Sequence, residues 1–504
     1  MLPRLGFSGA KSIAISSLIY SHSFLGVVAS KAAVIGLDGL CWSYLDKLLS
    51  HGAMPFTSTL LQKSVRSDLY SYPPWTMPAW TSIMTGVNPG KHGVFGFYNI
   101  DLRKNVKRMY NALDSVHPRI HEMLAMSRAA SITINPIPLY PILPLRGIHV
   151  IVHHFLAPRV TCYPKSLEKY AELLREVDSH PSGGREELLE KFVNKTDALR
   201  GVVEDLLSGE LDWRLFWLML EVPDHLLHQV SDMLDKTYSN EVRMFRNIDG
   251  IVKALASQVD YLIIVSDHGF TKSRKFISVN DALLREGLVV LEKPQRGGGS
   301  KATLLQYKIA RKLLPTPVRR LLKGFYRVVK GRELRIQFPD ISISKSRAFI
   351  AETHGGLYVR DESLIARVVK CLSRIPGLKV LRREEVYWGP KVKQAPQILL
   401  YPDFDRGYNL ANPKITGFIL IEREAPAHHP RGVLVVHPKP PDLEIPRTIR
   451  TYHVAPLIME LLKLPLPHAH DVKWIKPSAG VANYADKWRI VRRVYGLRRI
   501  LARG

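Results

Sequence analysis

The chain has 504 residues, of which 46% are hydrophobic and 23% charged, so it is long and apolar enough for a large core and is not a disordered chain. Its three cysteines, Cys41, Cys162 and Cys371, show no paired spacing, which argues against a disulfide framework or a zinc ribbon and favours a reducing, cytoplasmic compartment. The formal net charge of +27 favours anionic substrates or surfaces.

Residues 1–30 form an N-terminal apolar segment of uncertain status. A few basic residues precede a moderately apolar run from Ser12 to Ala29, as in a signal peptide. Serines and a histidine interrupt this run, and cleavage near Ser30 would leave the first core strand at the very start of the mature chain. The run is also short and polar for a membrane-spanning helix. A frayed or wrongly started N-terminus is therefore favoured, and export remains an open alternative.

Four apolar runs predict strands. They are nearly continuous rather than alternating, which is typical of strands that are buried on both faces in a largely parallel sheet between helix layers. The runs are AAVIGL at Ala32–Leu37, RLFWLML at Arg214–Leu220, DYLIIVS at Asp260–Ser266 and GVLVVH at Gly432–His437. The fold class is therefore α/β, and functional side chains of such sheets gather at the carboxyl ends of the strands.

A short helix is predicted after the first strand, in the segment TMPAWTSIMTG. Thr76 is a good N-cap, Pro78 is acceptable in a first turn, and Gly86 can end the helix in a left-handed conformation. The free amides of the first turn and the positive end of the helix dipole favour a phosphate or sulfate beside Thr76. Alone, this pattern shows only a helix cap.

The middle and the end of the chain hold much of the positive charge. Residues 98–200 show helical or loop-like patterns, and sheet-like patterning returns near Ser346. Between them, the connector KPQRGGGSK leads into the basic segment Lys301–Arg335, and a second basic segment begins at Lys487. Both segments predict amphipathic helices. They could lie on an anionic membrane or guide an acidic substrate, but packing of their apolar stripes on the protein itself is the favoured interpretation.

Acidic and histidine side chains flank the predicted strands in a pattern that suits metal ions. They are Asp38 in GLDG, Asp224 and His228 in EVPDHLLHQ, Asp267 and His268 in SDHGF, and His428 or His429 in EAPAHHPRG. The four-residue spacing of Asp224 and His228 places both on one face of a helical turn. Mixed carboxylates and imidazoles suit zinc, and a two-ion site is typical of phosphoryl transfer. Such ions also activate a threonine hydroxyl, which is otherwise a poor nucleophile.

These residues resemble the type I phosphodiesterase/nucleotide pyrophosphatase family of the alkaline phosphatase superfamily. The similarity covers most of the stretch from Lys31 to Trp474 and includes, in family order, GLDG, TMPAWTSIMTGVNPGKHG, SDHGF, GPKVKQAPQILLYP and TYHVAPLIMELLKLPLP. The resemblance implies an alkaline phosphatase-like catalytic domain over residues 31–475. We expect a basic helical insert at 293–340 to interrupt this domain and a basic tail at 476–504 to follow it.

The resemblance also implies the roles of the site residues. Two divalent ions are expected, zinc first, with manganese or magnesium as alternatives. One ion would be bound by Asp38, Thr76, Asp267 and His268, and the other by Asp224, His228 and His428. His428 is preferred to His429 because, as in relatives, it lies four residues before Gly432. Thr76 would attack phosphorus and carry a phosphothreonine intermediate.

The expected function is metal-dependent hydrolysis of phosphodiester or pyrophosphate bonds in a small phosphorylated substrate. One departure concerns substrate detail, because Phe97 stands where relatives place a phosphate-binding asparagine, and Asn99 is the nearest amide. Alternatives on the same scaffold are a phosphomonoesterase, a phosphonate hydrolase or a phosphotransferase, whereas a threonine argues against a sulfatase. An alternative of another class is a non-catalytic protein that binds anionic surfaces through its basic helices. No specific nucleic-acid motif is present.

Overall fold

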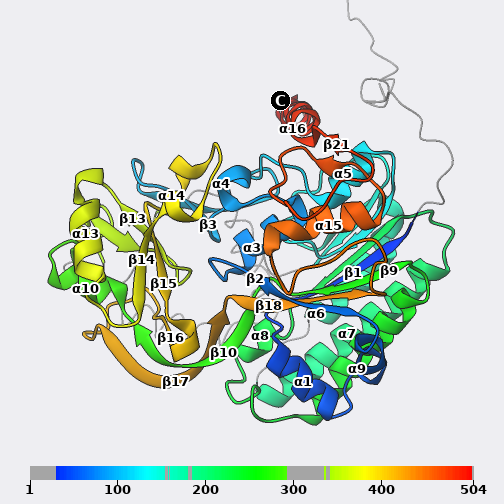
Figure 1. Cartoon of the computed structure of the whole chain (residues 1–504), viewed down its shortest axis with the longest axis horizontal. Helices are drawn as coiled ribbons and strands as arrows, with labels where there is room; N and C mark the ends of the chain where they lie inside the picture. The colour runs from blue at the N-terminus through cyan, green and yellow to red at the C-terminus, as the bar shows by residue number, and fades with distance from the viewer. Residues whose placement is uncertain are drawn as a thin grey trace, which may run out of the picture.

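A nine-stranded sheet forms the core of the larger lobe in this computed structural model (Figure 1). The structure describes residues 30–501 except 154–156, 158, 180–183, 292–333 and 336–340. In spatial order the strands are β19 (Thr448–Arg450), β2 (Val65–Tyr70), β18 (Arg431–His437), β9 (Tyr261–Val265), β1 (Ala32–Leu37), β8 (Leu215–Leu220), β5 (Ser131–Ile134), β6 (Ile148–Val152) and β7 (Thr161–Tyr163). From β9 to β6 all neighbours are parallel, while β18 and β7 run antiparallel to theirs.

The central strands bury both faces because successive side chains point to opposite sides of the sheet. In β1, Ala33, Ile35 and Leu37 belong to one hydrophobic core. Ala32 and Val34 belong to the core on the other face. The same alternation runs through β8, β9 and β18. The predicted largely parallel α/β sheet is therefore confirmed, and each of the four predicted strands lies within one residue of its expected bounds.

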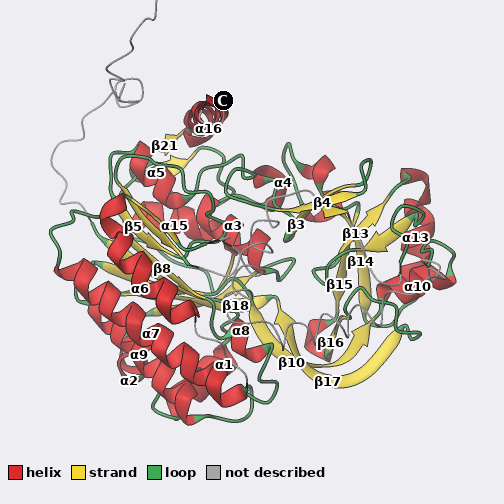
Figure 2. Cartoon of the chain, turned by 180° about the vertical axis from the view of Figure 1, so that it is seen from behind, coloured by secondary structure: helices red, strands yellow, loops and turns green. Residues whose placement is uncertain are grey.

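Helices cover both faces of this sheet. One layer contains α1 (Trp42–Ser50), α2 (Pro55–Leu61), α6 (Glu168–Ser179), α7 (Arg185–Ser208) and α9 (Ser239–Ala256), which Figure 2 shows beside the sheet. The opposite layer contains α3 (Thr76–Thr85), α5 (Ile120–Met126) and α15 (Val454–Leu461). Helix α3 is buried along its whole length, so its first turn is fixed against the sheet.

Residues 98–200 differ from the helical or loop-like expectation. Besides α5, α6 and α7, they contain β3 (Tyr98–Asp101), β4 (Val106–Met109) and the sheet strands β5, β6 and β7. These strands have only three to five residues each. A run this short gives too few residues for a hydrophobic period to stand out from its surroundings.

A smaller lobe is built on a four-stranded antiparallel sheet. Its strands are β12 (Ala348–Ile350), β13 (Gly356–Val359), β15 (Ile398–Pro402) and β14 (Leu378–Arg382), and α10 (Val279–Arg285) and α13 (Ile365–Leu372) pack against them. The long ribbon of β10 (Gly269–Ile277) and β17 (Leu420–His429) connects the two lobes (Figure 1). The predicted return of sheet patterning near Ser346 corresponds to β12 and β13.

The basic segments are only partly described. Residues 1–29 and nearly all of the predicted insert lie outside the described residues, so the insert's helices and the domain bounds stay predictions. The tail forms α16 (Tyr484–Leu501), in which Trp488 and Val491 pack on Ala112 and Leu143. This packing is the interpretation that the sequence favoured for the tail. None of the described helices is long and apolar enough to cross a membrane.

Candidate active site

Two groups of potential metal ligands meet where β1, β8 and β9 end. The first group is Asp38, Asp267 and His268, and the second is Asp224, His228 and His428. Within each group the nearest nitrogen and oxygen atoms all lie within 4.8 Å of one another. The groups adjoin, because the Nε2 atom of His268 lies 3.9 Å from the Oδ1 atom of Asp224. All six residues were singled out from the sequence, although their roles as ligands stay predictions.

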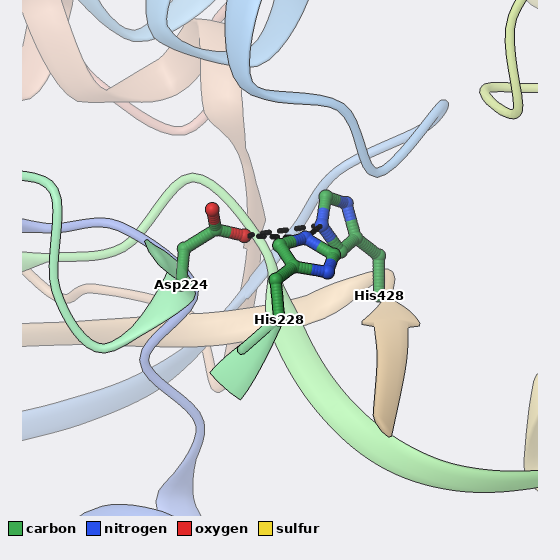
Figure 3. A group of neighbouring side chains, drawn as sticks. All are labelled: Asp224, His228 and His428. Carbon is green, nitrogen blue, oxygen red and sulfur yellow. Dashed lines mark hydrogen bonds and ion pairs between the residues drawn. The ribbon is translucent and has the colours of Figure 1, made fainter. Parts of the chain in front are cut away.

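In the second group the donor atoms of three side chains point toward one another (Figure 3). Asp224 opens the helical turn α8 (Asp224–Leu227), and His228 follows at its end. The Asp224 Oδ1 atom lies 3.3 Å from Nε2 of His228 and 3.0 Å from Nε2 of His428. The two Nε2 atoms are 2.8 Å apart. His225 faces elsewhere, and its ring packs on Phe192.

The two adjacent histidines of β17 point in opposite directions, as successive strand residues do. His428 turns toward the site, where its Nδ1 atom hydrogen-bonds the Pro74 carbonyl oxygen at 2.9 Å. His429 turns away, and its Nε2 atom lies 3.4 Å from Oδ1 of Asp405. Antiparallel pairing of β17 with β10 brings His428 opposite Phe270, beside His268. The structure therefore brings His428, and not His429, into the group.

The first group leaves three buried polar atoms without a partner. Asp38 accepts a hydrogen bond from Nε1 of Trp80 on one oxygen, and Asp267 accepts one from the Gly39 amide on one oxygen. Their other oxygens each lie 3.4 Å from Nε2 of His268. Among the described residues, none of these three atoms has a hydrogen-bond partner. Buried polar atoms are nearly always paired, so this arrangement fits a divalent cation.

The charges of the site lead to the same interpretation. Burial, together with the charges of Asp267 and Asp224, raises the pKa of Asp38 well above its usual value. Burial and the charge of Asp224 likewise raise the pKa of Asp267. Burial lowers the pKa of His268 and keeps its imidazole neutral, which is the form that binds metal. Clustered carboxylates of this kind ionise together only when a cation compensates their charge.

Thr76 lies at the start of α3, but it is not the N-cap that the sequence predicts. Trp75 has an extended backbone and is the N-cap, whereas Thr76 is the first helical residue and is only 4% exposed. The first helical hydrogen bond is donated by the amide of Ala79, so the amides of Thr76 and Met77 face out of the helix end. Gly86 ends the helix at φ +72°, as predicted.

Contacts made by residues on both sides of Thr76 connect the start of α3 to the two ligand groups. Two residues before it, the Pro74 carbonyl contacts His428 of the second group. Four residues after it, on the same helix face, Trp80 donates to Asp38 of the first group. The threonine therefore starts a helix that is tied to both groups.

A cavity of about 220 Å³ opens beside the second group and reaches the smaller lobe. His228 and His428 of the second group line it. Aromatic rings of Trp75, Phe276 and Phe404 line its walls. The polar groups of the smaller lobe and the ribbon that reach it are Thr353, His354, Asn409, Asn412 and Arg423. A substrate attached at the ligand groups would extend into this cavity.

Glu352 of the smaller lobe is a site residue that the sequence analysis missed. Its buried carboxylate accepts hydrogen bonds from Nε1 of Trp75 at 3.2 Å and from the backbone amides of Phe97 and Tyr98 at 2.9 and 3.0 Å. It therefore holds the residue before Thr76 from across the lobe boundary. Glu352 stands in FIAETHGG, which carries no recognisable motif. The Phe97 ring packs edge-on against Trp75, with the ring centres 5.5 Å apart.

Comparison with known proteins connects this site to a family. The model of the family "Type I phosphodiesterase / nucleotide pyrophosphatase" matches residues 32–331, which is more than half of the chain. The chain belongs to this family. The match includes Asp38, Thr76, Asp224, His228, Asp267 and His268. No curated protein matched the chain.

Two solved structures of hydrolases are similar to this chain in fold. Phosphonoacetate hydrolase from Sinorhizobium meliloti is 15% identical, with 86% of this chain and 96% of that chain covered and a TM-score of 0.56. Murine ectonucleotide pyrophosphatase/phosphodiesterase 5 is also 15% identical, with 87% of this chain and 96% of that chain covered and a TM-score of 0.50. At this identity the likeness shows the alkaline phosphatase-like fold.

We predict that His428→Ala lowers the affinity for one divalent ion by at least about tenfold, because the variant loses a donor atom of the second group. His429→Ala is the matched control, since its side chain faces Asp405, and it should bind metal as the wild type does. Elemental analysis after dialysis against graded zinc measures both. Equal losses in the two variants would contradict the placement of His428.

We predict opposite effects of Asp38→Asn with and without metal. In the metal-free protein at pH 7, an aspartate whose folded pKa is raised costs stability, because it ionises more readily when unfolded. Asn removes this cost and keeps an acceptor for Trp80, so the melting temperature should rise. Zinc should then stabilise the variant much less than the wild type, which gains about 2.7 kcal/mol at a hundredfold excess over Kd. Calorimetry that shows equal zinc stabilisation would contradict a ligand role.

We predict that Glu352→Ala lowers kcat on a chromogenic phosphodiester by about tenfold to a hundredfold, because it would displace Thr76, which the sequence analysis expects to be the nucleophile, and a slightly displaced nucleophile reacts slowly. Glu352→Gln should recover only part of this loss, since its amide group faces an N–H donor. KM should change less than kcat in both variants. Glu422→Gln, an exposed site on β17, is the control. Unchanged kcat in Glu352→Ala would contradict a positioning role.

Proposed function

We propose that this family member is a metal-dependent hydrolase of phosphodiester or pyrophosphate bonds that uses Thr76 as its nucleophile. The observation that carries the proposal is the position of Thr76 at the start of α3, between one ligand group contacted through Pro74 and another contacted through Trp80. A buried hydroxyl at a helix N-terminus, beside two groups of metal ligands, suits attack on an anionic phosphoryl group.

Two divalent ions fit the donor atoms. Asp38, Asp267 and His268 would hold one ion together with the Thr76 hydroxyl, and Asp224, His228 and His428 would hold the other. When bound, the ions would lower the pKa of the hydroxyl and compensate charge on the phosphoryl group. The mixed nitrogen and oxygen donors suit zinc, with manganese or magnesium as alternatives.

The residues of the chain then carry the reaction in two steps. In the first, the Oγ1 atom of Thr76 forms a bond to phosphorus, the bond from phosphorus to the leaving oxygen breaks, and the hydroxyl proton passes to solvent. The outward-facing amides of Thr76 and Met77 would bind a phosphoryl oxygen. In the second, a water oxygen bonds to phosphorus, Oγ1 leaves and regains a proton. Phosphothreonine is thus the covalent intermediate, and with a diester substrate its phosphorus still carries the second ester group.

Other reactions on the same scaffold remain alternatives. Phosphonate hydrolysis uses the same attack on phosphorus, and phosphonoacetate hydrolase shares this fold. A phosphomonoesterase would act on phosphorus that carries one ester group instead of two. A phosphotransferase would pass the phosphoryl group to an acceptor other than water. Phe97, in place of the asparagine expected from relatives, is the feature that leaves the preferred substrate open. Turnover of a diester, a monoester and phosphonoacetate by one preparation separates these reactions.

We predict that Thr76→Ala lowers diester hydrolysis by at least about a thousandfold, because the nucleophile is lost. Metal content should stay close to that of the wild type, since the carboxylates and imidazoles remain. Thr76→Ser should keep part of the activity. Thr81→Ser, one turn further along α3, is the control for an altered helix. Near wild-type turnover by Thr76→Ala would contradict the assignment.

A further inference from the structure

A second cavity, of about 490 Å³, lies between the two lobes on the far side of Tyr72. Its wall contains six aromatic side chains: Tyr70, Tyr72, Tyr387, Trp388, Tyr401 and Tyr452. Tyr72 lines both this cavity and the one at the candidate active site. Strand β15 separates the two, because Leu400 and Pro402 face the active-site cavity and Tyr401 faces the other. We call the second cavity the Trp388 groove.

Trp388 is exposed yet held in place. It is 43% exposed, which is unusual for a large aromatic ring. Its Nε1 atom donates to Asp471 Oδ1 at 2.9 Å, and its ring meets Tyr452 edge-on, with the centres 5.6 Å apart. Its backbone packs on Gly90, where an added Cβ would lie 2.6 Å from the Trp388 carbonyl oxygen. A ring already fixed in this way loses little conformational entropy when a ligand stacks on it.

The groove wall also contains two cationic side chains, Arg450 and Lys379. The Arg450 guanidinium lies over the Tyr70 ring, 4.4 Å from its centre, and Lys379 stands in the same wall. Neither side chain forms an ion pair within the described part of the chain. Glu385, also in the wall, accepts the backbone amide of Arg382 at 2.6 Å and so caps its own helix, α14 (Arg383–Val386). Two cations therefore remain available to an anionic ligand.

We propose that the Trp388 groove binds a nucleotide unit, with its base stacked on Trp388 and its phosphate beside Arg450 and Lys379. An uncharged aromatic ligand would not interact with the two cations. Inorganic phosphate would not stack on the aromatic wall. Aromatic platforms combined with cations are the usual means of binding nucleotide units without reading their sequence. The guanidinium stacked on Tyr70 is already oriented for such a ligand.

The groove adjoins the reacting centre through Tyr72, four residues before Thr76. If the proposed function holds, a nucleotide chain would place one unit in the cavity beside His228 and His428 and a further unit in the Trp388 groove. The substrate class is then an oligonucleotide-like diester. The binding of a nucleotide to the groove does not itself depend on catalysis.

Equilibrium binding of AMP to the purified full chain, with and without a chelator, tests the site. Chelation weakens phosphate binding at the metal ligands. It should leave AMP binding in the groove unchanged. Trp388→Ala and Arg450→Gln should each weaken AMP binding to the chelated protein by about tenfold. Phe418→Ala, which removes a ring that is 67% exposed outside the groove, should have no effect. Adenosine and ribose 5-phosphate should each bind more weakly than AMP.

Identical AMP affinity in Trp388→Ala, Arg450→Gln and Phe418→Ala would overturn the proposal, as would loss of all AMP binding on chelation. Trp388 and Arg450 lie on different elements, and the melting temperature of each variant is measured. A loss of AMP binding that is caused by misfolding can therefore be recognised. This experiment gives the same answer whether or not Thr76 is the nucleophile, so failure of the proposed function shows separately in the Thr76→Ala assay.

Kinetics then distinguish a substrate unit from a separate nucleotide. Trp388→Ala should raise KM for a trinucleotide by about tenfold and leave KM for bis(4-nitrophenyl) phosphate unchanged, because only the longer substrate reaches the groove. Unchanged KM for both substrates would overturn the oligonucleotide assignment. In that case weakened AMP binding would still support the site, with a free nucleotide as its ligand.

Discussion

The burial of acidic side chains at the end of a parallel sheet is the constraint on which this structure depends. Asp38 and Asp267 are almost fully buried, and both lie close enough to Asp224 for its charge to raise their pKa values. Water cannot compensate these charges, and the neutral imidazole of His268 does not do so either. A divalent cation between these groups would compensate their negative charges. The residues that destabilise the metal-free protein are therefore suited to bind metal at a catalytic centre.

The two lobes divide the tasks around that centre. The nine-stranded sheet supplies Asp38, Asp224 and the Asp267–His268 pair from its strand ends, and the β10–β17 ribbon brings His428 back across them. The smaller lobe supplies Glu352, which holds the residue before Thr76, and part of the walls of both cavities. Chemistry is thus set by the larger lobe, and the shape available to a substrate is set by contacts between the lobes.

The sequence predicted the parts that local patterns determine. The continuous apolar runs identified β1, β8, β9 and β18, and the strand-end motifs identified the six acidic and histidine residues that the structure groups together. The cap at Thr76 was wrong, because Trp75 adopts the extended conformation that ends the loop, and nothing local distinguishes these two positions. Glu352 and Trp388 were missed because their roles arise from contacts across the lobe boundary. Such contacts join residues more than 250 positions apart and leave no spacing to recognise.

The central claim is that Thr76 attacks phosphorus, and trapping the covalent intermediate tests it most directly. Rapid acid quenching of the enzyme during turnover of a phosphodiester, followed by mass spectrometry of its peptides, locates any phosphoryl group on the chain. The account predicts one phosphoryl group on Thr76, still esterified to the part of the diester that has not left, which appears with substrate and disappears when substrate is exhausted. Turnover with a phosphoryl group on another residue, or with none at any quench time, would contradict it.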